Sequence, residues 1–381
     1  MRRLGPLVIE RDVNPTTGWM LGVSLLAIAA ALAAAGLVFW AYGTDPVGAY
    51  AAVVRETFIN VGAASEVVRR TIPLLLCGVG LTLAFRAQFW NIGAEGQLLA
   101  GAVGATAVAL FAPIHGRWII PAMFLAGFVA GALWGLMPTL LRLRLEVNEV
   151  ITTLMMNYVA LYVVAWLVHG PWKGATMFGF AYTDPFAEAA RLPLIPGTRV
   201  HWPTLLIGLA LALVLGFVLS RTRLGFEIRV LGQNLAAGLY AGINPLRTTL
   251  VVMLVSGGVA GLAGVGEVAG VHHKLLDPNQ VSLGYGYAAI IVAWLARGSP
   301  LAVVLTATFL GLIFTSGDVL KVVMQMPFRV TDVFNGLMLF FLIGSERLLY
   351  YRVRVAPARA AAAAAEAHPA EPSPPSAGGE G

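Results

Sequence analysis

The sequence predicts an all-α, polytopic membrane protein with about ten transmembrane helices and with both chain ends in the cytoplasm. Two properties of the 381-residue chain predict this class: 58% of its residues are hydrophobic and only 12% are charged. A soluble domain has about 25% charged residues, and the mean hydropathy here is +0.80. The third observation is a series of uncharged or nearly uncharged runs, several of which are long enough to cross a bilayer.

The first part of the chain contains a polar arm and the first expected spans. Residues 1–18 form the arm, and residues 19–42 are a run without a charge that has aromatic residues near both ends, where they suit the two membrane interfaces. Residues 45–70 are mixed in polarity and suit a helix in the outer interface. The apolar run 71–85 is short for a span. Its Cys77 is the only cysteine in the chain, so we expect a packed thiol and no intrachain disulfide.

Residues 89–97, FWNIGAEGQ, place three polar side chains among glycines directly before the apolar run 98–114. Glycines let a backbone break inside a membrane, and such breaks are tolerated where they line a cavity. We therefore expect an interrupted helix here. The next span, 118–141, has glycines every four residues, which predict a close-packing face between helices. These glycines are Gly127, Gly131 and Gly135.

The remaining spans are connected by one long external segment and one basic internal segment. The span 150–168 leads to residues 169–202, a polar, proline-containing connection. The spans 203–220 and 248–266 flank the basic segment 221–247. The other expected spans are 281–296, 299–317 and 333–345.

The distribution of basic residues predicts the orientation. Fifteen of the 25 Lys and Arg residues fall in segments that this arrangement places in the cytoplasm, where short loops carry an excess of positive charge. We therefore expect a cytoplasmic arm at residues 1–18 and a transmembrane domain at 19–349, with a cytoplasmic loop at 221–247. The Ala- and Pro-rich tail, residues 350–381, is expected to be disordered and cytoplasmic.

The segment 221–247 is polar and basic in a chain that is otherwise mostly apolar. Asn234 can cap a helix and Gly242 can end one, which predicts a helix of about two turns between them. A helix this short is not stable alone in water, and two of its leucines are four residues apart and share a face. We expect it to dock on a cytoplasmic partner; an ordinary basic loop is the alternative. The expected contact residues are Asn234, Leu235, Leu239, Tyr240 and Gly242.

No arrangement of residues for bond-making chemistry is visible. The sequence has no Walker A motif, no HExxH and no cysteine pair, so we expect no enzyme activity, no metal site and no cofactor in this chain. Polar groups inside the membrane are a better lead, because a carboxylate there usually faces protein or a water-filled path. The alternative is that these groups only cap helix ends or reach out to water. The expected pathway residues are Asn91, Glu95, Gln97, Asn148, Asn157 and Glu267.

Three stretches resemble the permeases of bacterial ABC importers in the class that serves branched-chain amino acids, simple sugars and nucleosides. FWNIGAEGQLLAGA (89–102) and NEVITTLMMNYVA (148–160) are most similar to the longer permease of purine nucleoside importers. RTRLGFEIRVLGQNLAAGLYAGI (221–243) is similar to the family's cytoplasmic coupling loop, but it lacks the usual Pro-Glu-Ala-Ala-Arg pattern before Tyr-Ala-Gly-Ile. Docking would then rest on the leucines and the flanking arginines.

The resemblance implies a permease subunit of an ATP-driven importer in the inner membrane, with a nucleoside as the expected solute and ATP used by a partner. The implied partners are a second homologous permease, a cytoplasmic ABC ATPase and an extracytoplasmic, lipid-anchored substrate-binding protein; no nucleic acid is expected. A simple-sugar permease of the same class is the main alternative. An ion-coupled secondary transporter and a non-transporting membrane scaffold are further alternatives.

Overall fold

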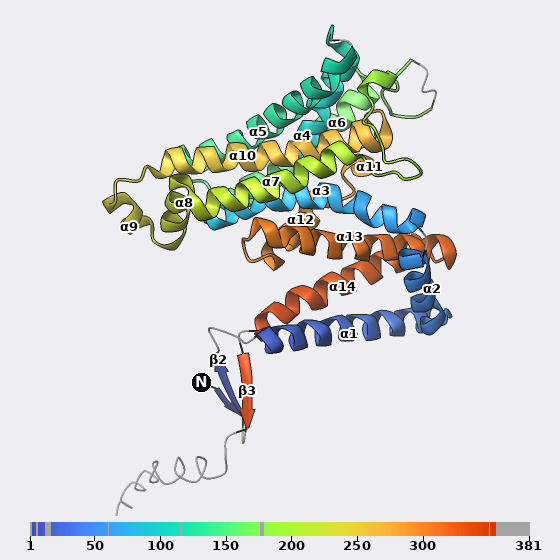
Figure 1. Cartoon of the computed structure of the whole chain (residues 1–381), viewed down its shortest axis with the longest axis vertical. Helices are drawn as coiled ribbons and strands as arrows, with labels where there is room; N and C mark the ends of the chain where they lie inside the picture. Colours follow the sequence, from blue (N-terminus) through green and yellow to red (C-terminus); the bar gives the residue numbers. More distant parts are fainter. Residues whose placement is uncertain are drawn as a thin grey trace, which may run out of the picture. The chain divides into compact units, whose positions relative to one another are not determined.

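A computed structural model describes residues 2–4, 7–11, 17–59, 61–114, 116–175, 179–349 and 351–355. Within these residues, nine helices are long and apolar enough to cross a membrane, which confirms the all-α polytopic class (Figure 1). They are α1 (Thr17–Ala41), α3 (Val61–Arg86), α4 (Ala94–Phe111), α5 (Ile119–Leu145), α6 (Glu149–His169), α7 (Trp202–Arg221), α10 (Pro245–Val265), α13 (Pro300–Val323) and α14 (Phe328–Leu349).

The chain forms two compact units, Gly43–Asn335 and the two chain ends, Met1–Tyr42 with Gly336–Gly381. The smaller unit contains an antiparallel sheet of β1 (Arg2–Leu4), β2 (Leu7–Arg11) and β3 (Tyr351–Val355). We predicted no strand here, although Tyr351–Val355 reads YRVRV and alternates basic residues with Tyr and Val, a pattern typical of strands. The tail from residue 356 lies outside the described residues, and its expected disorder stays a prediction.

The predicted boundary between an interfacial helix and a short span near residue 71 is wrong. α2 covers only Pro46–Ile59, and α3 begins at Val61 and continues without interruption to Arg86. The charged residues that suggested a boundary are paired within the structure, as Arg69 with Glu66 and Arg70 with Asp318. Paired charges can lie inside a helix that continues into the membrane, so the span is longer than its apolar run.

The centre of the larger unit is α10, which packs along α5, α4 and α3 (Figure 1). The predicted glycine face of α5 makes one of the close approaches to α10. A Cβ atom at Gly131 would collide with the carbonyl oxygen of Gly257, and one at Gly261 would collide with that of Gly127. Glycine at these positions therefore lets the backbones of α5 and α10 touch, as small residues do between membrane helices. Cys77 is buried in α3, as expected.

The run 281–296 was predicted as a single span, and this prediction is wrong. It is divided into α11 (Pro278–Ser282) and α12 (Tyr285–Leu295). The chain between them passes through Leu283 (φ +46°) and Gly284 (φ +75°), both in the left-handed region that a helix cannot continue through. The apolar composition of the run concealed this break.

The two ends of the larger unit carry different elements. The inner end gathers the last residue of α3, the helix α8 (Arg223–Gln233) and the turn between α12 and α13, where Arg86 Nε donates to the Gly298 carbonyl (2.9 Å). The outer end gathers the start of α3, the end of α13 and the π-helix η3 (Gly266–His272), which continues α10. Short helices complete the unit: α9 (Leu235–Tyr240), η1 (Gly116–Trp118) and η2 (Glu188–Ala190). The assignment of the inner end to the cytoplasm rests on the charge count and stays a prediction.

Candidate functional site

The interruption predicted at residues 89–97 lies between α3 and α4, and Asn91 is fully buried in it. The Asn91 amide nitrogen donates to Gln97 Oε1 (3.1 Å) and to Ser256 Oγ of α10 (3.2 Å). Its side-chain oxygen accepts from Gln97 Nε2 (3.2 Å) and from the backbone amide of Gly93 (3.0 Å). One buried side chain therefore connects the interrupted segment, the first turn of α4 and the middle of α10.

Helix α6 contacts the same interruption from the other side. Asn157 Oδ1 accepts from the Gly96 amide (2.9 Å), and Asn157 Nδ2 donates to the Ile92 carbonyl (2.8 Å). Thr153 Oγ1, one turn earlier on α6, accepts from the Ile92 amide (3.1 Å). These bonds satisfy backbone groups that a broken helix would otherwise leave exposed to hydrocarbon.

We call these residues the break cluster: Asn91, Gln97, Thr153, Asn157 and Ser256. Two members, Thr153 and Ser256, were missed by the sequence analysis. Hydroxyl side chains are common in membrane helices, where they often donate to a backbone carbonyl of their own helix. Thr153 Oγ1 makes such a bond to the Glu149 carbonyl (2.6 Å). The available signal was spacing, because Thr153 precedes Asn157 by one helical turn and must share its face.

Glu95 joins two helix N-termini. It lies in the first turn of α4, is almost fully buried, and accepts a hydrogen bond from the Gly286 amide of α12 through Oε2 (2.7 Å). The N-cap residue of α12, Gly284, offers no side-chain cap of its own. A Cβ atom at Gly286 would collide with the backbone of Glu95, so glycine is needed for this contact. A negative group between two helix N-termini is stabilised by both helix dipoles, which makes Glu95 a brace between α4 and α12.

Asn148 is not part of this arrangement. It is exposed at the inner end of α6, where its side-chain oxygen accepts from the amides of Val150 (2.9 Å) and Ile151 (3.3 Å). The neighbouring Glu149 forms an ion pair with Arg142 of α5 (3.2 Å). The geometry at Asn148 matches the alternative stated above, a residue that caps a helix end.

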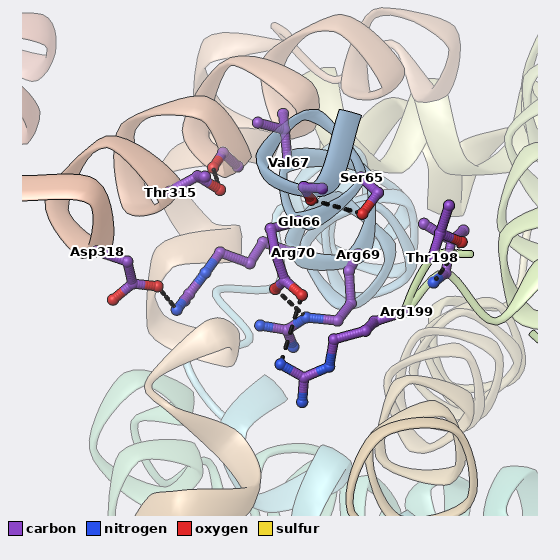
Figure 2. A network of polar contacts seen from close by, with 12 residues as sticks. Ser65, Glu66, Val67, Arg69, Arg70, Thr198, Arg199, Thr315 and Asp318 are labelled. Carbon is purple, nitrogen blue, oxygen red and sulfur yellow. Dashed lines mark hydrogen bonds and ion pairs between the residues drawn. The ribbon is translucent and has the colours of Figure 1, made fainter. Parts of the chain in front are cut away.

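A second group of polar residues lies at the outer end (Figure 2). Arg69 Nε lies 2.5 Å from Glu66 Oε2, one turn earlier on α3, and Arg199 Nη1 lies 3.5 Å from the other oxygen of Glu66. Arg70 points the other way and forms an ion pair with Asp318 of α13 (Figure 2). These pairs connect the start of α3 to α13 and to the loop before α7.

Glu267 belongs to this outer end and is completely buried, with 0% of its side chain exposed. It lies on the π-helix η3, a backbone form that is frequent at functional sites. Neither carboxylate oxygen accepts a hydrogen bond from a described residue, and His272 Nε2 lies 3.8 Å from Oε2. Its burial excludes the alternative that Glu267 reaches out to water from a helix end.

His201 is a further buried residue at the outer end that the sequence analysis did not single out. Its ring packs against Gly270, and neither ring nitrogen has a hydrogen-bond partner among the described residues. Burial, and then the positive charge of Arg69, lower the pKa of His201 to about 4, so the ring is neutral at neutral pH. We call the polar residues of the outer end the outer cluster: Glu66, Arg69, Arg70, Arg199, His201, Glu267, His272 and Asp318. Among the described residues, no group of three metal-ligating side chains is arranged to hold a metal ion.

The short helix predicted between Asn234 and Gly242 is confirmed as α9. Asn234 Oδ1 accepts from the Ala237 amide (3.1 Å), and Gly242 follows the helix with a positive φ of +73°. Leu235 and Leu239 are each more than half exposed, and Tyr240 is 97% exposed. The helix therefore presents three large apolar or aromatic side chains away from its own chain.

Two of the arginines near α9, Arg223 and Arg229, bond to groups of this chain. A second helix, α8, precedes α9. The Arg229 side chain of α8 donates a hydrogen bond to the Leu219 carbonyl near the end of α7. Arg223 Nε pairs with Glu227 (3.2 Å), whose other oxygen accepts from Thr248 (3.3 Å). These bonds fix α8 against α7 and α10, so α8 is a support for α9.

Comparison with known proteins gives one family. The family model described as "Branched-chain amino acid transport system / permease component" matches residues 63–343. This range includes the break cluster, the outer cluster and α9. No solved structure gives a significant match.

Several individual proteins are similar over most of the chain. The glucose ABC transporter permease protein TsgB13 of Haloferax volcanii is 36% identical over 91% of this chain and 94% of its own length. The guanosine ABC transporter permease protein NupP of Bacillus subtilis is 31% identical over 86% of this chain and 94% of its own length. The nucleoside ABC transporter permease protein NupB of Lactococcus lactis is 29% identical over 77% of this chain and 82% of its own length.

Proposed function

Because this chain belongs to the family of branched-chain amino acid transport system permease components, we propose that it forms half of the solute pathway of an ATP-driven importer. It is a multi-pass membrane protein and a transport subunit, not an enzyme. In this proposal it lies in the inner membrane and pairs with a second, homologous permease. A cytoplasmic ABC ATPase uses ATP, and an extracytoplasmic, lipid-anchored binding protein delivers the solute.

We propose a nucleoside as the solute. The support is the similarity to permeases named for guanosine and for nucleosides, together with the signature at residues 89–102. A simple sugar is the second candidate, and the similarity to a permease named for glucose favours it. Uptake of labelled guanosine and labelled glucose by cells that carry the complete importer, compared with cells lacking this chain, separates the two candidates. Guanosine uptake that is unchanged by deletion of this chain would exclude the nucleoside.

The observation that carries the coupling part of the proposal is the exposure of α9. A six-residue helix is too short to be stable by itself, yet this one is capped by Asn234 and carries exposed Leu235, Leu239 and Tyr240. Large apolar side chains on a short, capped helix at the inner end suit insertion into a groove of the ATPase. Pocket-filling apolar and aromatic anchors of this kind dominate the binding energy of most interfaces.

The test is the double substitution Leu235→Asp/Leu239→Asp. Burying unpaired carboxylates costs several kcal/mol, which would weaken binding of the ATPase by about two orders of magnitude or more. The measurement is co-purification of the ATPase with the permease from membranes, together with ATP hydrolysis stimulated by solute and binding protein. Permease abundance in the membrane should not change, because no span is altered.

A matched control makes the same chemical change elsewhere. Leu194→Asp/Ile195→Asp alters two exposed apolar residues in the loop before α7, and should leave the ATPase bound. If the ATPase co-purifies normally with the α9 variant and hydrolysis still responds to solute, α9 is only a linker. The coupling contact would then be sought first around Arg142 and Glu149.

A further inference from the structure

One face of α6 carries aromatic side chains that the described chain leaves half or more exposed. Tyr158, Tyr162 and Trp166 follow one another at intervals of four residues and therefore share a face of the helix. Tyr158 is 50% exposed, Tyr162 is 70% exposed and Trp166 is 64% exposed. Met155, one turn before Tyr158, extends the same exposed face toward the inner end.

The depth of these residues matters, because aromatic side chains are ordinary at the two membrane interfaces. Trp166 lies close to the outer end of α6 (Glu149–His169) and could be such an anchor. Tyr158 cannot, because at 1.5 Å per residue it is about 14 Å from the start of the helix and about 17 Å from its end. A phenol hydroxyl at that depth would face hydrocarbon, where a polar group without a partner is costly.

The neighbouring helix α5 provides an exposed surface for comparison. Its exposed side chains also recur at intervals of four residues, but none can form a hydrogen bond. They are Leu125, Val129, Leu133 and Met137. The same spacing thus carries aliphatic residues on α5 and aromatic residues, two of them with hydroxyls, on α6.

The face continues from α6 onto α12. The Tyr287 side chain of α12 lies close to Asn157, the neighbour of Tyr158 in the sequence and a member of the break cluster. Tyr287 is partly exposed, and so is Trp294, which is two helical turns further along α12 and on the same side. Tyr158 and Tyr287 therefore lie beside Asn157, one of the polar residues that fix the helix break.

We infer that Tyr158, Tyr162 and Trp166 of α6, with Tyr287 and Trp294 of α12, line an aqueous path and stack against a ring-bearing solute such as a nucleoside. We call these five residues the aromatic face. The inference rests on the proposed function. It goes beyond that function by naming the residues that contact the solute and the kind of contact they make. The face is incomplete in one chain, and the second permease closes it from the opposite side.

The chemistry of the aromatic face suits transport better than tight binding. Aromatic rings offer flat contact to any nucleobase, and the hydroxyls add hydrogen bonds without imposing one fixed orientation. A path must attract a solute enough for it to enter, while each contact stays weak enough for it to leave. Successive rings one helical turn apart provide such a series of weak, equivalent contacts.

The same geometry explains why the break cluster does not itself contact the solute. Asn91 and Asn157 are buried, and their hydrogen bonds are made to protein groups. Glu95 is engaged by the N-terminus of α12. The break cluster positions the aromatic face, and its role in the pathway is bracing.

The experiment measures water access to single cysteines in the Cys77→Ser background. The test positions are Tyr158→Cys, Tyr162→Cys and Tyr287→Cys, with Met155→Cys as a second position on the α6 face if an aromatic substitution lowers abundance. The matched controls are Leu125→Cys and Val129→Cys on α5, which are exposed to a similar degree. Membranes that contain the complete importer are treated with a charged, water-soluble methanethiosulfonate reagent.

We expect the test positions to react at least about tenfold faster than the α5 controls, because the reactive thiolate forms in water and not in lipid. We also expect guanosine, but not glucose, to slow the reaction at Tyr158→Cys and Tyr162→Cys several-fold. Equal and slow reaction at both sets of positions would mean that lipid or a dry protein interface covers the α6 face, and the inference would be overturned.

Reaction that glucose slows and guanosine does not would overturn the stacking of a nucleobase while leaving an aqueous path in place. Reaction that neither solute slows would overturn solute contact at this face. Neither result touches the co-purification test of α9, so failure of this inference is distinguishable from failure of the proposed function.

Discussion

The break cluster and the outer cluster are both groups of polar side chains in the same helical unit, and their buried members differ in how completely their hydrogen bonds are made. In the break cluster, Asn91 and Asn157 are bonded to protein groups through both their nitrogen and their oxygen atoms. In the outer cluster, both oxygens of Glu267, both ring nitrogens of His201 and the Nε atom of Arg70 lack a hydrogen-bond partner among the described residues.

The difference indicates two kinds of role. A fully bonded polar group in a low-dielectric interior holds its neighbours in one arrangement, since every alternative would leave a donor or an acceptor unpaired. A buried polar group without a partner favours any rearrangement that supplies one. We therefore interpret the break cluster as a rigid brace and the outer cluster as the part of the unit that is better suited to change its contacts. The following predictions test this comparison, from the largest expected effect to the smallest.

The largest effect is expected for Asn91→Ala. The substitution removes the common partner of Gln97, Ser256 and the Gly93 amide, and leaves these buried groups unpaired. Each unpaired buried group costs about 1–3 kcal/mol, so we expect a loss of several kcal/mol in the free energy of unfolding. The measurement is thermal unfolding of the purified permease in detergent, followed by tryptophan fluorescence.

The matched control is Asn148→Ala, which removes an asparagine that only caps the exposed end of α6. Loss of an N-cap costs about 1 kcal/mol, so this variant should unfold at a temperature much nearer that of the unaltered protein. Equal losses for the two variants would show that the break cluster is no more rigid than a helix end.

The next effect is a dependence of stability on pH that His201 causes. Its pKa in the folded protein is lowered to about 4 by burial and by Arg69, from about 6.5 in the unfolded chain. Below pH 6.5 the unfolded chain takes up a proton that the folded protein does not, so stability falls as the pH falls toward 4. Between pH 7 and pH 5 the expected loss is about 2 kcal/mol.

The variant His201→Gln isolates this effect. It should show a smaller loss of stability between pH 7 and pH 5 than the unaltered protein when both are measured by thermal unfolding. His169→Gln, at the exposed end of α6, is the control for the chemical change itself. An unchanged pH dependence in His201→Gln would show that the His201 ring is not held neutral by its surroundings.

A functional effect of intermediate size is expected at Glu95. Glu95→Ala removes the acceptor at the N-terminus of α12, a loss of about 1–2 kcal/mol that would reduce the population of the correctly braced arrangement by about tenfold. Glu95→Gln keeps an acceptor oxygen for the Gly286 amide and should retain more uptake. The measurement is the initial rate of solute uptake at equal membrane abundance, with the ATPase still bound. Uptake by Glu95→Ala at the unaltered rate would make Glu95 dispensable for transport.

The sequence predicted more of the architecture than of the contacts. Apolar length located nine long helices, but it missed the start of α3, because paired charges such as Arg70–Asp318 do not end a helix. It also missed the break at Gly284, because one glycine in an apolar run has many possible uses. The glycines of residues 89–97 were recognised, since polar side chains stand beside them.

For the candidate site, sequence reasoning identified residues that are distinctive by type. Asn91, Gln97 and Asn157 meet in the structure as one cluster, although α6 and the break are far apart in the chain. It could not show that Glu95 accepts a hydrogen bond at the N-terminus of α12, because the donor is the backbone amide of Gly286 and no sequence pattern identifies such a donor. The exposed tyrosines of α6 were missed for a related reason, since exposure depends on which neighbours cover a helix.

The smallest effect is expected for Glu267→Gln, and it tests the comparison most directly. The amide has nearly the shape of the carboxylate, and no hydrogen bond from a described residue to either oxygen is lost. The guanidinium groups nearby already have partners, Arg69 with Glu66 and Arg70 with Asp318. An ionised carboxylate that is buried without hydrogen bonds is costly, and the neutral amide avoids that cost. We therefore expect a change of less than about 1 kcal/mol in the free energy of unfolding. Thermal unfolding beside Asn91→Ala measures the contrast. A loss at Glu267→Gln as large as that at Asn91→Ala would show that the outer cluster depends on the Glu267 charge. The two clusters would then be equally rigid, and the part of the protein that rearranges during transport would have to lie elsewhere.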